Sequence, residues 1–182
     1  MENFGEIVQR ISIFFPAFLI ALVFHEFAHA WMANRYGDET AAWRGRLTLN
    51  PVAHMDPLGT VLFPLLSISM GSGVFFGWAK PVPIDPRNFR DYRGGLFWVA
   101  FAGPLSNIVL GFLSAVVYAL FRKYVPLDFA FHDALAAMLE VLVVINFALA
   151  VFNLIPLPPL DGSNMVLSFL GYENTRRFLA IQ

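Results

Sequence analysis

The sequence lacks cysteine altogether and is poor in charge, with 14% charged residues and four histidines among 182 residues. The absence of cysteine excludes disulfide bonds and metal sites built on thiolates. Soluble domains carry roughly 25% charged residues, so the composition argues against an ordinary soluble domain. The net charge of −1 provides no general attraction to nucleic acid, and we expect no nucleic-acid partner. The acidic N-terminus has no basic region of the signal-peptide type, so we expect no signal peptide.

Apolar residues dominate the chain, at 58% of the composition and a mean hydropathy of +0.62. We therefore predict an all-α polytopic membrane protein, built as a single membrane-embedded domain over residues 1–182. We also expect a re-entrant or extended β-like segment between the first two core helices, and a short strand or irregular edge within residues 40–49. The predicted helices are residues 6–34, 58–79 (re-entrant or short), 96–124, 134–154 and 163–180, with no final C-terminal helix after them.

One stretch in the first predicted helix carries chemistry, His25-Glu26-Phe27-Ala28-His29. Positions i and i+4 lie on one face of a helix, so both imidazoles can reach a single cation, and Glu26 can reach a water bound to it. Soluble zinc peptidases use this spacing, with two histidine ligands and the glutamate as general base. Ionisable side chains at membrane depth are costly, which favours a functional site over a chance match.

A catalytic zinc ion usually has three protein ligands and one open position, so a third ligand is needed. Asp161 follows a predicted membrane helix, on the same side as the carboxyl end of the first one. An Asp-Gly pair is also typical of an ordinary turn or a helix N-cap, and both alternatives stay open. The other candidates are His54, His132, Asp56, Asp85 and Glu140.

The distribution of basic residues predicts an orientation. If the N-terminus is outside and residues 58–79 re-enter, nine basic residues face the cytoplasm and three face outside. A full crossing by residues 58–79 would separate Asp161 from His29. The re-entrant interpretation therefore agrees with both the charges and the metal site.

Together these motifs resemble the site-2 protease family of intramembrane metalloproteases (peptidase family M50), in particular its short members without a PDZ domain. The resemblance rests on residues 25–29, 50–54, 77–82, 102–107 and 153–162. It covers nearly the whole chain. One departure is Pro-Pro-Leu-Asp-Gly where the family usually has Asn-Pro-Asp-Gly, a variant that keeps the aspartate.

The resemblance implies one Zn²⁺ held by His25, His29 and Asp161, with Glu26 as the base that activates the water. It also implies that Asn153 assists catalysis at the oxyanion. The implied partners are transmembrane protein substrates and the lipid bilayer, in the cell membrane, with the active site toward the cytoplasm. The alternatives are iron as the metal, or a membrane metal-binding or metal-transport protein without proteolytic activity.

A second hypothesis concerns residues 78–86, where three prolines exclude a helix. An unwound substrate helix needs partners for its freed backbone groups. Val82 and Ile84 keep N–H and C=O groups facing one way, so this segment could pair with substrate as an added strand. The alternative is a rigid linker. Asn107 is a packing amide or a cavity residue, and His54 is a loop residue or a support of the site.

Overall fold

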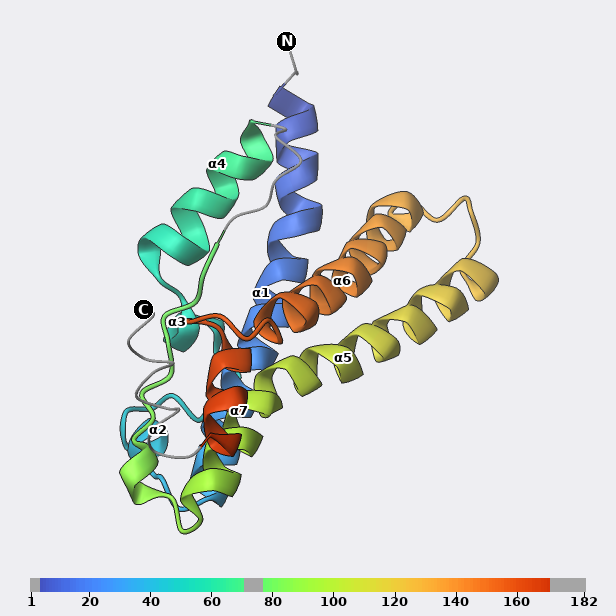
Figure 1. Ribbon diagram of the computed structural model, residues 1–182. Coiled ribbons are helices and arrows are strands. Elements are labelled where there is room, and N and C mark those ends of the chain that lie inside the picture. Colours follow the sequence, from blue (N-terminus) through green and yellow to red (C-terminus); the bar gives the residue numbers. More distant parts are fainter. Residues whose placement is uncertain (1–3, 71–76, 171–182) are drawn as a thin grey trace. The chain divides into compact units, whose positions relative to one another are not determined.

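The computed structural model describes residues 4–70 and 77–170. Three of its helices are long and apolar enough to cross a membrane: α1 (Phe4–Arg35), α5 (Tyr92–Tyr124) and α6 (His132–Asn153) (Figure 1). They correspond to the predicted helices at 6–34, 96–124 and 134–154. In the described part of the chain every regular element is a helix or a helical turn, which confirms the all-α class.

The end of α1 follows from one glycine. Gly37 has a φ of 104°, a conformation that only glycine adopts at little cost. The N–H of Gly37 donates to the Asn34 carbonyl, and the N–H of Asp38 donates to the Ala33 carbonyl. This is the Schellman pattern, and it places Gly37 at the C′ position, close to the predicted helix end at residue 34.

The expected strand within residues 40–49 is wrong, because the structure has the short helix α2 (Thr40–Trp43) there. The Asp38 carboxylate accepts a hydrogen bond from the Thr40 N–H and so starts a helical turn. Gly45, with a φ of 66°, ends the turn, and the N–H of Arg46 donates to the Ala41 carbonyl. Local side-chain and glycine chemistry therefore outweighs the β-branched and aromatic composition of this stretch.

The chain divides into two compact units. Unit 1 comprises residues 1–23, 50–81 and 108–147, and unit 2 comprises residues 24–49, 82–107 and 148–182. Long helices contribute to both, since α1 and α5 each begin in one unit and end in the other.

Unit 1 contains α3 (Pro51–His54), the π-helical turn η1 (Pro57–Leu62) and α4 (Phe63–Ser69). The continuous helix over Pro57–Ser69 is shorter than the 18 residues of a candidate span. It is also below the roughly 20 residues that a bilayer requires, and this length favours the re-entrant interpretation of residues 58–79. Residues 71–76 of that segment lie outside the described residues. Phe18, Leu22 and Val23 form the buried core of this unit, with Ala79 and Ile145 packed against them.

Unit 2 holds residues 82–85, the last part of the segment 77–85 that leads into η2 (Pro86–Asn88), and the short helix α7 (Asp161–Phe169). Residues 77–85 have no regular secondary structure, so the expected β-like segment is not confirmed: it forms no strand among the described residues. Ile84 of this segment packs against the buried cluster of Ala33, Phe89 and Val99. The predicted helix over 163–180 corresponds to α7, and its part beyond residue 170 lies outside the described residues.

Candidate metal centre

Three donor atoms converge in unit 2. His25 and His29 lie on α1, and Asp161 is the first residue of α7. Asp161 Oδ2 lies 3.2 Å from His25 Nε2 and 3.3 Å from His29 Nε2, and the two Nε2 atoms are 3.0 Å apart. Among the described residues, these three side chains form a group of histidine and acidic residues that could hold a metal ion.

The other nitrogen of each imidazole is already bonded. His29 Nδ1 lies 2.7 Å from the Val99 carbonyl oxygen, and His25 Nδ1 lies 2.6 Å from Asn107 Oδ1. A carbonyl oxygen only accepts, so each Nδ1 donates its proton. In the neutral rings both Nε2 atoms therefore carry lone pairs, which point at each other and at a carboxylate. A neutral imidazole whose Nδ1–H is donated to a protein oxygen can bind a metal ion through its Nε2 atom.

These atoms fit a zinc ion. Two lone pairs and a carboxylate at about 3 Å repel one another, and a single proton can satisfy only one of the three contacts. Asp161 Oδ2 is buried and has no hydrogen-bond partner in the described part of the chain, which is costly unless a cation is bound. Donors placed about 2.0–2.1 Å from a tetrahedral zinc are roughly 3.3 Å apart, close to the spacing here. Two imidazoles, one carboxylate and no thiolate are a common catalytic zinc set.

Gly103 of α5 forms one wall of the centre. A Cβ atom at this position would lie 2.3 Å from His29 Nε2 and 2.7 Å from His25 Cε1. Residues 102–107 are one of the motifs on which the family resemblance rests. The structure requires glycine at 103, because any side chain there would occupy the space of the donor atoms.

A second glycine positions Asp161. The Cβ of a residue at 162 would lie 2.4 Å from the Leu154 carbonyl oxygen and 2.5 Å from that of Ile155. Those carbonyls belong to the turn that follows α6, where the helix has ended at Asn153. Glycine therefore lets α7 begin directly against this turn, and Asp161 at its first position reaches the two histidines.

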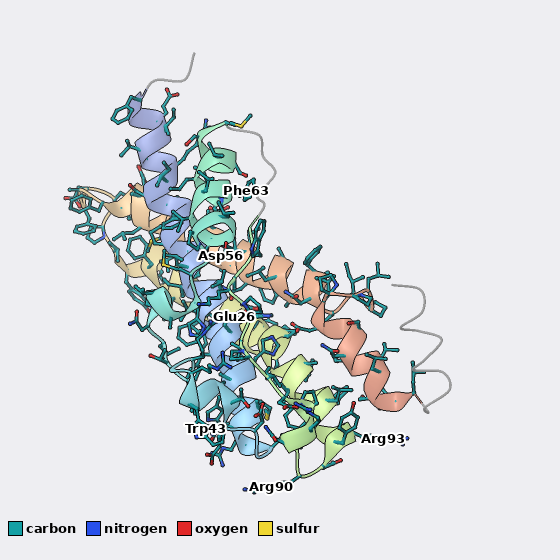
Figure 2. All side chains as sticks on the ribbon, turned by 90° about the vertical axis from the view of Figure 1, so that its left-hand side faces the viewer. Glu26, Trp43, Asp56, Phe63, Arg90 and Arg93 are labelled. Carbon is teal, nitrogen blue, oxygen red and sulfur yellow. The ribbon has the colours of Figure 1, made fainter. Side chains whose placement is uncertain are left out.

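Glu26 lies beside this centre on α1, next to the extended segment (Figure 2). Its Oε2 accepts a hydrogen bond of 3.2 Å from the Val82 N–H. Arg46 is also near: burial lowers the pKa of its guanidinium, and the Glu26 carboxylate partly opposes that effect. Sequence reasoning missed both neighbours. Arg46 is buried, with just 6% of its surface exposed.

The remaining candidates do not join the three donors. Asn153, at the end of α6, donates its amide to the Leu149 carbonyl of its own helix. Asp85 pairs with Arg87, whose side chain lowers the pKa of Asp85 to about 2. Asp56 caps η1 through the N–H groups of residues 58 and 59. His54, His132 and Glu140 belong to unit 1.

Comparison with known proteins agrees with this geometry. The profile of Peptidase family M50 matches residues 122–180. The chain is 38% identical over 81% of its length to "Putative zinc metalloprotease YwhC" of Bacillus subtilis. It is 33% identical over 89% of its length to Rip2 of Mycolicibacterium smegmatis, and 32% identical over 97% to Rip2 of Mycobacterium tuberculosis. Both Rip2 proteins carry the same description. No solved structure matches the chain significantly.

The matched region spans 64% of the YwhC sequence, and 58% and 66% of the two Rip2 sequences. The chain therefore spans about two thirds or less of the length of these relatives. On these grounds the chain belongs to peptidase family M50, the site-2 protease family that its motifs resemble.

Proposed function

We propose that this protein is an intramembrane zinc metalloprotease that hydrolyses peptide bonds in transmembrane segments of its substrates, near the cytoplasmic face of the membrane. One observation carries the proposal. Three buried donor atoms lie within 4.8 Å of one another, and Glu26 stands beside them on a helix that is long and apolar enough to cross a membrane. An acidic side chain next to a metal centre fits hydrolysis, whereas a storage or transport site has no need of one.

In this mechanism His25, His29 and Asp161 would hold the zinc ion, which when bound lowers the pKa of a water molecule and polarises the scissile carbonyl. The Val99 carbonyl and Asn107 orient the two imidazoles, so that their Nε2 lone pairs remain available. Glu26 accepts a proton from the attacking water and passes it to the departing amine. Asn153 is proposed to stabilise the oxyanion, for which its amide must turn from the Leu149 carbonyl that it now contacts.

The substrate must present an unwound peptide, because a helix hides its carbonyls in its own hydrogen bonds. We propose that the extended segment receives it. Ile84 has no backbone hydrogen-bond partner among the described residues, while its side chain packs in the core. The N–H of Asp85 donates to the Asp38 carboxylate over 2.8 Å, which fixes the segment beside α1. A fixed, extended backbone with free groups suits the addition of a substrate strand.

The proposed function is tested with a panel of transmembrane substrates and purified protein. Wild type should cleave at least some members of the panel, while Glu26→Gln should lose activity by roughly 100- to 10,000-fold, the usual contribution of a general base. Glu26→Gln should keep its zinc, because Glu26 is not among the three donors. Zinc-loaded wild type that cleaves none of the panel, or an equally active Glu26→Gln, would favour a metal-binding or metal-transport protein instead.

The proposed orientation leads to a separate prediction. Single cysteines at positions 44 and 90 should react with reagents only after the cytoplasmic face is made accessible, and a cysteine at 128 should react from outside. The prediction rests on the excess of basic residues near Arg44 and Arg90, because basic loops favour the cytoplasmic side. Because the chain has no cysteine, each label reports one site. Labelling of position 90 from outside would rule out the re-entrant interpretation of residues 58–79.

A further inference from the structure

The Val82 N–H binds Glu26, a contact that the substrate-strand hypothesis did not include. Its N–H is not free for a substrate, since it donates to Glu26 Oε2 at 3.2 Å. The same segment is anchored again at Asp85, through Asp38, and by Ile84 in the core. Pro81 and Pro83 flank Val82 in the sequence, and each has a fixed φ angle. The donor is therefore held in place from both sides.

A glutamate side chain on a helix needs such a contact if it is to act as a base. Three rotatable bonds separate the carboxylate from the backbone, and without a partner they sample several rotamers. Glu26 is only partly buried, so packing alone does not fix it. A carboxylate offers about four acceptor positions on two oxygens. Binding through Oε2 leaves Oε1 available to take a proton.

We propose that the Val82 N–H is a positioning group for Glu26. It fixes the carboxylate through Oε2 and directs Oε1 toward the water that is to be deprotonated. The buried Arg46 guanidinium, near the same carboxylate, assists by attracting it to this place. The inference rests on the proposed proteolytic function. It also divides the extended segment into two roles: Val82 serves the base, and Ile84 serves the substrate strand.

Two proline variants separate these roles in the full chain. Val82→Pro removes the N–H that Glu26 accepts, and we expect kcat to fall about 10- to 100-fold, as for other groups that orient a catalytic side chain, with KM within about twofold. Ile84→Pro removes the free N–H and should raise KM with little change in kcat. Val82→Ala keeps the N–H and should lose far less than Val82→Pro. Zinc content should stay near wild type in all three.

The hydrogen bond between Val82 and Glu26 can also be tested by thermal stability, without measuring proteolysis. In metal-free protein, Val82→Pro should lower the melting temperature more in wild type than in a Glu26→Ala background, because the hydrogen bond is already lost there. Equal shifts in the two backgrounds, or a Val82→Pro enzyme with the kcat of Val82→Ala, would overturn the positioning role. If wild type cleaves no substrate, the proteolytic proposal fails, and the melting-temperature comparison still decides whether Val82 fixes Glu26.

Discussion

Gly103→Ala is expected to weaken zinc binding strongly, although it adds a single methyl group. The new Cβ would lie 2.3 Å from His29 Nε2, far inside van der Waals contact. The ring cannot simply move away, because its Nδ1 is held by the Val99 carbonyl at 2.7 Å. The methyl must therefore displace a donor atom, and we expect the zinc affinity to fall by about 100-fold or more.

The matched control is Gly111→Ala on the same helix. There the added Cβ lies 3.0 Å or more from the nearest atoms, which belong to the Phe147 ring. A ring edge can shift by a few tenths of an ångström, so Gly111→Ala should keep its zinc. Elemental analysis of both purified variants makes the comparison. A Gly103→Ala protein with zinc equal to that of Gly111→Ala would mean that the donors are not placed as described.

Asp38→Ala is expected to destabilise the protein by roughly 3 kcal/mol, since it removes a buried carboxylate that is the common acceptor of several part-buried hydrogen bonds. Asp38 has no exposed surface. Its carboxylate accepts hydrogen bonds from the side chains of Thr40 and Asn88 and from the N–H groups of Thr40 and Asp85. The loss of this acceptor would also release the extended segment that carries Val82.

The same residue gives the stability a pH dependence. Burial raises the pKa of Asp38, but hydrogen bonds from Thr40, Asn88 and Asp85 lower it more, so the net pKa is below its ordinary value. A lowered pKa stabilises the fold above the ordinary aspartate pKa of about 4, and this stabilisation is lost as the pH falls through the lowered value. Melting curves of wild type and Asp38→Asn should therefore converge at acidic pH. The exposed neighbour Glu39 supplies the control Glu39→Gln, and an equal effect of both substitutions would contradict the prediction.

Local rules predicted much of this protein from its sequence. The i, i+4 spacing placed His25 and His29 on one helix face, and the glycine at 37 marked the end of α1. Asp161 was chosen because it follows a membrane helix on the appropriate side, and the structure brings its Oδ2 to about 3.2 Å from the first of the two histidines. The metal role of the three residues remains a prediction.

What sequence reasoning missed depends on contacts between distant segments. Val82 and Glu26 are 56 residues apart in the sequence. Nearly every residue has a backbone N–H, so the residue type at position 82 does not indicate this contact. The role of Gly103 depends on the rings of His25 and His29, which come from a helix about 75 residues earlier in the chain. The strand expected within 40–49 failed because propensity was weighed without the Asp38 hydrogen bond that starts a helical turn.

The central claim is that His25, His29 and Asp161 form a zinc site and that Glu26 serves it without binding the metal. The zinc content of purified Asp161→Ala, measured beside wild type and Glu26→Gln, tests this most directly. Wild type and Glu26→Gln should each hold close to one zinc per chain, and Asp161→Ala should hold much less, because two imidazoles alone bind zinc weakly. Full zinc in Asp161→Ala would show that another residue is the third ligand and would contradict the site described here.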